Sequence, residues 1–362
     1  MITPPSGPVF VVGSMRSGST MLRLMLDSHP RIAIPPETGF MGGAAAAKRI
    51  PEWRFGDGWY ERLGWSEAEV DARLREFYGG MFQRYADALG KPRWGEKTPF
   101  HTVHMQQMAR IFPDAGFVGI VRHPGAVAIS MHRRFHYEFG EALAYWSDAN
   151  KQMLASGLAL GERFALCRYE DLVLQSEPVL RELLGFLGEP WAPEVVEHHR
   201  VQREKGAPRA AEGSTITSDP VDPSRAAAWL ALVSQDERVQ LRRVAATAEF
   251  LGYDISSPDV SAGWTDGLGN VPLVVTGGDL EQRRRAWSPE VDLVVQGRPQ
   301  LMEIGPEELA VRLVRAEAAL ARVRSRRAVL VVDAVRRVQH GRSRRDVAAA
   351  WRTIRSAVRP GR

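Results

Sequence analysis

The sequence predicts a three-layer α/β domain in which a parallel sheet is flanked by helices. Short apolar segments at residues 9–12, 116–121 and 164–166 are each followed within a few residues by a helical pattern. This alternation of strand and helix is typical of a parallel sheet. A length of 362 residues and a hydrophobic content of 44% suffice for one large domain with an appendage. Ligands of such sheets bind at the carboxyl ends of the strands, where we look for function.

The first motif, residues 8–20 with the sequence PVFVVGSMRSGST, joins the first apolar strand to a glycine loop and the start of a helix. The first N–H groups of a helix have no partner within it, and the helix dipole favours an anion there. Gly13 and Gly18 have the spacing of the nucleotide-binding loop G-x-x-x-x-G-K-S/T, but Ser19 stands at the lysine position. The motif predicts a P-loop-like anion site that needs no metal and uses Arg16, Ser17, Ser19 and Thr20.

Residues 1–255 are predicted to form this domain. A second strand is expected to end shortly before Glu37, and residues 59–90 have helical spacing and are predicted to cover one side of the site. Segment 201–224 is polar and has no periodicity, which is typical of a loop that closes as a lid. Helical spacing returns after this loop, over 225–232 and 235–251.

The sequence changes character near Ser256, where we place a boundary. Residues 256–305 are interpreted as a linker or a small β-containing segment, with apolar stretches at 271–275 and 291–295. Residues 306–362 are predicted to be an arginine-rich helical extension, with helical spacing over 307–324 and 346–358.

The charge of the chain is unevenly distributed. The net charge is +5, but residues 321–362 alone carry about +11, which leaves about −6 for the rest. The extension has three interpretations: a solvated appendage, a surface for a partner or an oligomer, or a contact with an acidic surface such as anionic lipid. Nucleic acid is not expected as a partner, because Trp351 is the only aromatic residue after Trp287.

The cysteine and hydropathy patterns bear on the compartment. Cys167 is the only cysteine, which excludes an intramolecular disulfide and a cysteine-rich zinc site. The amino-terminus lacks a basic segment followed by an apolar run, and no window approaches the roughly 18 apolar residues of a membrane span. We therefore expect a soluble, cytoplasmic protein without a transmembrane segment.

Several motifs resemble those of the sulfotransferases that use PAPS (3′-phosphoadenosine 5′-phosphosulfate), in particular the branch of bacterial and tyrosylprotein sulfotransferases. They follow the order of the family between residues 8 and 252. The matching stretches are VVGSMRSGST at 11–20, HPRIAIPPET at 29–38, WGEKTPFH at 94–101, VRHPGAVAISMHRR at 121–134, CRYEDLV at 167–173 and LLGFLGEPW at 183–191.

The resemblance implies that PAPS is the co-substrate, that no metal takes part, and that two pockets hold the anionic ends of PAPS. The pocket for the 3′-phosphate is assigned to Arg122 and Ser130, and a planar guanidinium at a strand end suits a phosphate dianion. Tyr169 matches a tyrosine near the nucleotide, and His123 stands where many members have an acidic residue. The pocket for the 5′-phosphosulfate is assigned to Arg16, Ser17, Gly18, Ser19 and Thr20.

The same resemblance assigns the catalytic residues, among which we count Arg16. Glu37 matches the glutamate that acts as general base, and a carboxylate needs hydrogen-bond reach of the acceptor hydroxyl for that role. Lys97 matches the lysine at the bridging oxygen, where a fixed cation meets the developing charge.

Histidines and the lid offer further candidates. The histidines after Arg93 are the competing site for the base, but as an H-x-x-H pair without an evident third ligand, His101 and His104 are interpreted as structural, as are His198 and His199. The lid residues that could contact the nucleotide are Lys205, Arg209, Ser214 and Thr215.

We therefore predict a sulfotransferase that moves a sulfuryl group from PAPS to a hydroxyl acceptor, either a carbohydrate, a lipid, a phenol or a natural product. One alternative is a P-loop kinase or NTPase, which Ser19 at the lysine position disfavours. The other is a catalytically silent nucleotide-binding or scaffold protein, which Glu37 and Lys97 argue against. The sequence leaves the acceptor and the oligomeric state open.

Overall fold

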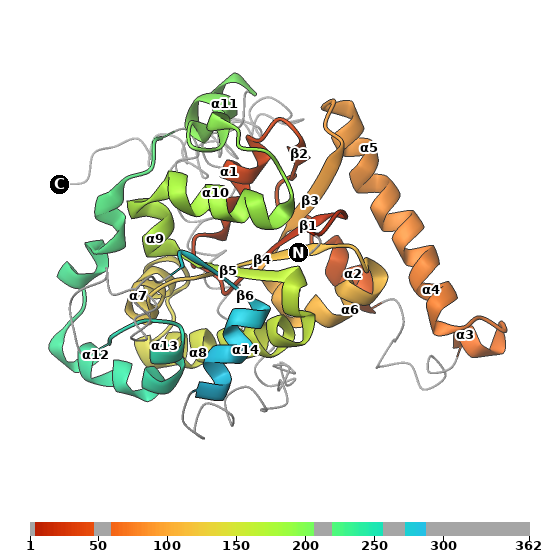
Figure 1. Ribbon diagram of the computed structural model, residues 1–362. Coiled ribbons are helices and arrows are strands. Elements are labelled where there is room, and N and C mark those ends of the chain that lie inside the picture. The colour runs from red at the N-terminus through yellow and green to blue at the C-terminus, as the bar shows by residue number, and fades with distance from the viewer. Residues whose placement is uncertain (1–3, 47–58, 206–218, 256–271, 287–362) are drawn as a thin grey trace, which may run out of the picture. The chain divides into compact units, whose positions relative to one another are not determined.

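The computed structural model describes residues 4–46, 59–205, 219–255 and 272–286, all within one compact unit of residues 1–299 (Figure 1). A six-stranded sheet with the order β2-β3-β1-β4-β5-β6 forms its centre. Only the last strand is antiparallel to its neighbour. The strands are β1 (Val9–Val12), β2 (Ile32–Ala33), β3 (Arg93–Lys97), β4 (Gly116–Val121), β5 (Phe164–Arg168) and β6 (Val274–Thr276).

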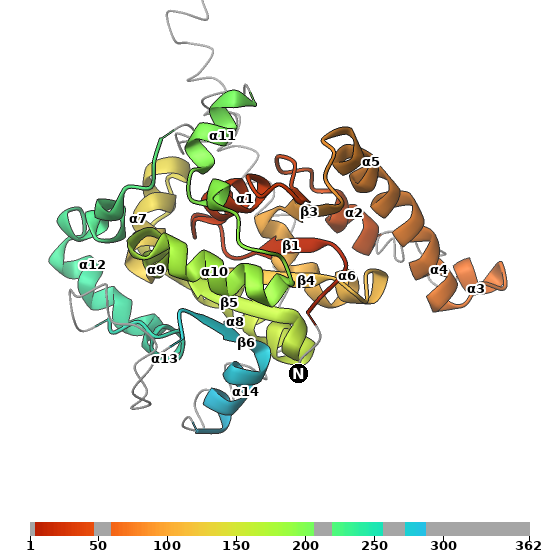
Figure 2. The same ribbon diagram turned by 45° about the horizontal axis from the view of Figure 1, so that its top comes forward.

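Helices cover both faces of the sheet. On one face lie α1 (Ser19–Asp27), α9 (Tyr169–Leu174) and α10 (Ser176–Leu187), and on the other lie α7 (Pro124–Phe135) and α8 (Phe139–Leu160), as the two views in Figures 1 and 2 show. This arrangement confirms the predicted three-layer α/β fold.

The remaining helices surround these layers. Residues 59–90, predicted as helical, form a long helical arm beyond β3 that includes a π-helical turn at Arg75–Gly79 (Figure 1). The α-helices not yet named are α2 (Phe40–Ala46), α3 (Trp59–Arg62), α4 (Glu67–Leu74), α5 (Gly80–Ala88), α6 (Met105–Ile111), α11 (His198–Glu204), α12 (Gln235–Gln240), α13 (Ala245–Phe250) and α14 (Gly277–Ala286), and 3₁₀ turns span Pro99–His104, Gly161–Arg163, Pro193–Val195, Pro223–Ala226, Ala228–Ala231 and Leu241–Val244. No helix in the described ranges is long and apolar enough to cross a bilayer.

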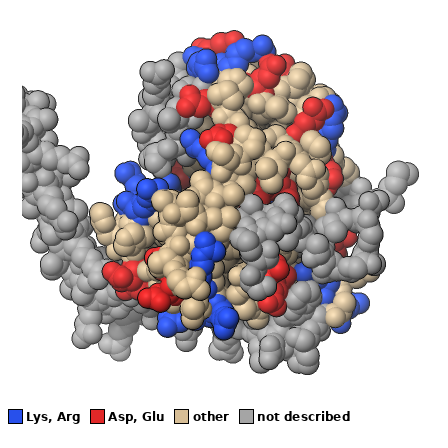
Figure 3. Space-filling model, turned by 90° about the vertical axis from the view of Figure 1, so that its left-hand side faces the viewer, with Lys and Arg blue, Asp and Glu red and all other residues tan. Residues whose placement is uncertain are grey.

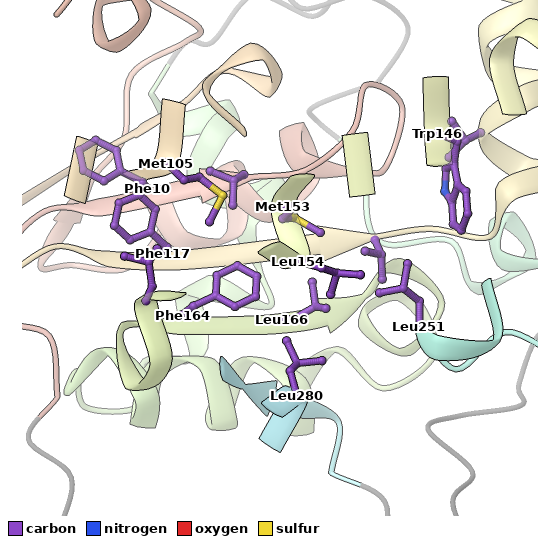
Figure 4. Packing of buried hydrophobic residues seen from close by; sticks show 14 of the residues in the cluster. Phe10, Met105, Phe117, Trp146, Met153, Leu154, Phe164, Leu166, Leu251 and Leu280 are labelled. Carbon is purple, nitrogen blue, oxygen red and sulfur yellow. The ribbon is translucent and has the colours of Figure 1, made fainter. Parts of the chain in front are cut away.

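The core follows from the alternation of side chains along the strands. Successive residues of a strand point to opposite faces, so Phe10 packs with the α8 side and Val11 with the α1 side. Figure 4 shows Phe10, Phe117 and Phe164 along one face, with side chains of α8 beside them. Because both faces are buried, the central strands read as continuous apolar runs, which is why the sequence reveals them.

The structure differs from the sequence-based expectations in three places. Strand β3 was not among the strands expected from apolar patterning, because its sequence RWGEK is mostly polar although all five residues are buried. Residues 225–232 form 3₁₀ turns rather than a regular helix. Of the apolar stretch 271–275, Val274 and Val275 belong to strand β6, which pairs with β5, and Leu280 of the following α14 is fully buried.

This third difference concerns the predicted domain boundary. Segment 256–305 is predicted as a linker or a small β-containing segment outside the domain, and the strand in its described part pairs with β5 of the domain's sheet. The apolar stretch at 291–295 and the arginine-rich extension of residues 306–362 lie outside the described residues.

Candidate active site

A cavity of about 730 Å³ opens at the carboxyl edge of the sheet. The chain after β1, β4 and β5 contributes Arg16, Arg122 and Tyr169 to its wall. In this topology β1 lies between β3 and β4, which is the kind of switch point where open α/β sheets bind ligands. The full lining consists of Met15, Arg16, Gly18, Ser19, Thr20, Met21, Pro36, Glu37, Pro99, Phe100, Arg122, Arg134, Phe135, Tyr169, Arg225 and Ala228.

The loop between β1 and α1 is fixed by groups from distant parts of the chain. Its Gly13 exchanges two hydrogen bonds with Thr102, because Gly13 N donates to Thr102 Oγ1 at 3.0 Å and Thr102 Oγ1 donates to Gly13 O at 3.2 Å. Met15 N donates to Tyr145 Oη at 3.0 Å. Arg16 has a φ of 67°, a left-handed conformation that is unusual outside glycine and is often found at functional sites. The loop is therefore held in a form that points Arg16 into the cavity.

Gly18 directly precedes α1 and permits close approach of an aromatic ring. Its φ is 99°, and a Cβ atom at this position would lie 2.3 Å from Cδ2 of Tyr169. Tyr169 in turn lies beneath the guanidinium of Arg122, 4.2 Å from the ring centroid. The glycine loop, the tyrosine and the arginine thus form one packed unit.

The predicted ligands of the two phosphate pockets lie side by side. Arg16 Nε donates to Ser130 Oγ at 2.9 Å, which joins the first pocket to the second. Burial, together with the guanidinium groups of Arg122 and Arg134, lowers the pKa of Arg16. Three like charges in one cavity repel one another and favour an anion between them.

An ammonium group lies behind the wall of this cavity, in contact with two residues that line it. Lys97, at the end of β3, has no exposed side-chain surface. Its Nζ donates to Thr20 Oγ1 at 3.1 Å and to Glu37 Oε1. The Glu37 side chain is 41% exposed and lines the cavity. The residues predicted as base and cation are therefore in direct contact.

Arg122 has donor capacity left for an anion. Its two hydrogen bonds are long, 3.4 Å from Nη1 to Arg16 O and 3.3 Å from Nη2 to Arg225 O. Within the described ranges its buried Nε has no hydrogen-bond partner. Buried donors nearly always have a partner, so this site fits a ligand rich in acceptor oxygens such as the 3′-phosphate of PAPS.

Not every predicted ligand faces the cavity. Ser17 is fully buried with Oγ close to Gly13, and its N–H donates to Ser14 O at 3.3 Å. Ser130 lies behind Arg16 and is absent from the cavity wall. Ser17 therefore shapes the loop from inside, while Gly18, Ser19 and Thr20 face the cavity.

The lid candidates divide into one residue that the structure places and three that it does not. Lys205 Nζ donates to Asp27 Oδ2 at 2.7 Å, at the far end of α1. A helix of nine residues is about 13 Å long, so Lys205 is remote from the anion site at Ser19. Arg209, Ser214 and Thr215 lie outside the described residues.

The predicted structural histidines lie off the cavity wall, with His101 and His198 buried and His104 and His199 half-buried. His101 Nδ1 lies 2.5 Å from Glu96 Oε2, with both side chains almost fully buried. Burial lowers the pKa of His104, and it lowers the pKa of His198 to about 4. Within the described part of the chain, no three His, Cys, Asp or Glu residues are grouped to hold a metal.

Nine of the lining residues were not predicted as site residues, and four of these nine carry a charge or an aromatic ring. Arg134 and Phe135 end α7, the helix that begins after Arg122, and Phe100 follows Lys97 by three residues within the same motif. Their closeness to recognised motifs was an available signal. Arg225 lay beyond reach, because nothing in its local sequence shows that it returns to the cavity.

Positive charge is concentrated in the cavity, whereas the surrounding surface carries both signs. Figure 3 views the molecule from the side of α7, α9 and α12, and there Lys and Arg are interspersed with Asp and Glu. The four arginines that line the cavity are accompanied by one carboxylate, that of Glu37. This composition suits a small, highly charged anion.

The fold and the site together define a class of α/β protein that binds a nucleotide anion at a glycine loop without the lysine of the kinase motif. The sulfotransferase family model matches residues 8–193, half of the chain, and the chain belongs to the sulfotransferase family. It is a PAPS-dependent sulfotransferase.

Individual relatives agree with this assignment. Protein-tyrosine sulfotransferase 1 of Danio rerio is 27% identical over 295 residues, which covers 78% of this chain and 79% of that protein. Protein-tyrosine sulfotransferase A of Caenorhabditis elegans is 25% identical over 272 residues, with 72% and 70% covered. The solved sulfotransferase domain of the Synechococcus PCC 7002 olefin synthase shares the fold, with 22% identity, a TM-score of 0.50, and 70% of this chain and 97% of that domain covered.

Proposed function

We propose that this protein transfers the sulfuryl group of PAPS to a hydroxyl group on an aromatic ring, with Glu37 as general base and Lys97 at the leaving oxygen. The observation that carries the proposal is the position of Lys97 Nζ, which binds Thr20 Oγ1 and Glu37 Oε1, two residues of the cavity wall. This contact brings together the anion loop, the cation and the base that the reaction needs.

The donor site has two halves. The phosphosulfate fits the amides and hydroxyl groups of Gly18, Ser19 and Thr20 at the start of α1, with Arg16 beside them. The 3′-phosphate fits the free donor capacity of Arg122, while Ser130, which lies off the cavity wall, accepts a hydrogen bond from Arg16 and holds that side chain. Arg225 lines the same cavity and adds a further cation.

Glu37 and Lys97, the two partners of the ion pair, have different roles in the transfer. In an in-line transfer, the acceptor oxygen forms a bond to sulfur while the bond from sulfur to the bridging oxygen breaks. Glu37 takes the proton of the acceptor hydroxyl. Lys97 stabilises the charge that develops on the departing bisphosphate. In this scheme Lys97 exchanges Glu37 for the donor anion, which leaves the carboxylate free to accept the proton.

The wall beside Glu37 favours a ring-bearing acceptor. Phe100 is 64% exposed and Phe135 is 44% exposed, yet both line the cavity, together with Met21, Pro36 and Pro99. Exposed aromatic side chains at a cavity mouth are typical of a site for a flat apolar group. The relatives named above act, by their names, on protein tyrosine, whose hydroxyl is phenolic. A phenol therefore fits better than a carbohydrate.

A transfer assay with ³⁵S-labelled PAPS tests this function. The panel contains 4-nitrophenol, a tyrosine-containing peptide, and a monosaccharide as the polar control. We expect label on the phenolic acceptors and release of adenosine 3′,5′-bisphosphate in equal amount. Transfer to the monosaccharide alone would contradict the acceptor class, and no transfer to any acceptor would contradict the function. Labelled ATP with Mg²⁺ serves as the control for a kinase.

A further inference from the structure

We propose that Glu96 is a positioning residue that holds the loop carrying Glu37, residues 34–40, in place while Lys97 binds the donor. The inference rests on the function proposed above. Glu96 lies next to Lys97 at the end of β3, and its side chain is fully buried. Because neighbouring residues of a strand face opposite sides, Glu96 and Lys97 approach the Glu37 loop from different directions.

One carboxylate oxygen of Glu96 accepts hydrogen bonds from two threonines, one of them in this loop. Oε1 accepts from Thr38 Oγ1 at 3.1 Å and from Thr98 Oγ1 at 2.8 Å, and Thr38 N lies 3.4 Å away as a third donor. Hydrogen bonds to an ionised acceptor are stronger than those between neutral groups, and low surrounding polarity strengthens them further. The residue after the proposed base is thus bound through both its backbone and its side chain.

The two threonines extend the clamp to the start of α2. Gly39 N donates to Thr98 Oγ1 at 3.3 Å, and Phe40 N donates to Thr38 Oγ1 at 3.2 Å. The second carboxylate oxygen, Glu96 Oε2, lies 2.5 Å from Nδ1 of the buried His101. His101 thus lies against Glu96 from behind, while Glu96 binds Thr38 and Thr98 directly and these two threonines bind the amides of Phe40 and Gly39.

The other end of the loop is equally fixed. Ile34 N donates to Asp27 Oδ1 at 2.9 Å, and Ile34 O accepts from Arg23 Nη1 at 3.0 Å. Pro35 and Pro36 follow, and their rings restrict the backbone. Glu37 thus lies in a short segment that is anchored on both sides by buried side chains.

The contacts of Glu96 can keep Glu37 in position when Lys97 binds the donor instead of Glu37. The head group of Glu37 is partly exposed and contacts Lys97. When Lys97 turns to the donor anion, Glu37 loses that ion pair at the step that requires it in place. The contacts of Glu96 do not involve Lys97 and persist. Misplacement of a reacting group by about 1 Å can cost on the order of 10²-fold in rate.

The test compares four variants. Glu96→Ala removes the clamp, Glu96→Gln keeps an acceptor oxygen of the same shape, and Thr38→Val removes one hydroxyl donor. Glu189→Ala is the matched control, because Glu189 is a similarly buried carboxylate that pairs with Arg93 at 3.2 Å, at the opposite end of the same strand. Each is measured for transfer to 4-nitrophenol, for the Kd of adenosine 3′,5′-bisphosphate, and for hydrogen exchange of the amides of Thr38–Phe40.

We expect Glu96→Ala to lower kcat by about 10²-fold, to leave the Kd within about twofold, and to speed exchange at Thr38–Phe40. Glu96→Gln should keep most of the wild-type rate, and the rate of Thr38→Val should lie between those of Glu96→Ala and Glu96→Gln. Glu189→Ala should change only the melting temperature. A wild-type rate or wild-type exchange in Glu96→Ala would overturn the proposal, as would an equal effect of Glu189→Ala. If the wild-type protein transfers nothing, the proposed function fails, and hydrogen exchange still decides for or against the clamp.

Discussion

Replacing Gly18 by alanine should separate nucleotide binding from folding. The new Cβ atom would lie 2.3 Å from Cδ2 and 2.9 Å from Cε2 of Tyr169. The ring must therefore move, and with it goes the contact of 4.2 Å between that ring and the guanidinium of Arg122. The substitution reaches the proposed 3′-phosphate site through a single aromatic side chain.

The size of the effect follows from two contributions. An alanine in a left-handed conformation costs about 1–2 kcal/mol of stability. Loss of a contact between a cation and an aromatic ring costs about 0.5–2 kcal/mol, which corresponds to roughly 2- to 30-fold weaker binding of adenosine 3′,5′-bisphosphate. Gly90→Ala is the matched control, because Gly90 has a φ of +67° and a Cβ atom added there would meet nothing within 4 Å.

The measurement combines thermal unfolding with calorimetric titration of adenosine 3′,5′-bisphosphate. Both variants should lose stability through the backbone, and only Gly18→Ala should lose affinity. Equal affinities in Gly18→Ala and the wild-type protein would refute the packed unit of Gly18, Tyr169 and Arg122. Equal losses of affinity in both variants would show that general destabilisation is the cause.

Three further predictions concern other parts of the molecule. Arg122→Ala should remove the preference for adenosine 3′,5′-bisphosphate over AMP in thermal-shift titrations, and a folded variant that keeps this preference would refute the assignment. Burial lowers the pKa of His123 to about 3, so between about pH 6.5 and 3 only the unfolded chain takes up a proton at this residue. The free energy of unfolding, measured by urea unfolding, should therefore fall by about 2 kcal/mol from pH 6.5 to 5. It should fall by less in His123→Asn. Truncation after Asp254 removes β6 and exposes the edge of β5, so it should lower the melting temperature. Truncation after Ala286 keeps β6 and should leave bisphosphate binding intact. Equal melting temperatures of the two truncated proteins would contradict the role of β6.

The sequence was most informative where chemistry and burial coincide. The run Val9–Val12 is apolar because both faces of β1 are covered, and the glycine loop that follows has a spacing that few other structures require. These features allowed the carboxyl edge of the sheet, with Arg16, Arg122 and Tyr169, to be predicted before the topology was known. All three line one cavity.

The parts that could not be predicted depend on long-range contacts. Strand β3 is polar in sequence because its buried side chains are used for bonding, as when Arg93 donates to Leu187 O at 2.6 Å. The contact of Lys97 with Glu37 joins residues 60 positions apart. Strand β6 follows a long segment after the last predicted helix and pairs antiparallel with β5. Local patterns carry no information about such pairings.

Glu37 is the residue that we propose removes the proton from the acceptor in a transfer from PAPS. Glu37→Gln keeps the shape of the side chain and removes the proton acceptor, so the most direct measurement is the single-turnover rate of ³⁵S transfer from PAPS to 4-nitrophenol in this variant. We expect a rate lower by about 10²–10⁴-fold with the Kd of adenosine 3′,5′-bisphosphate unchanged. A variant that transfers label at the wild-type rate would contradict this role.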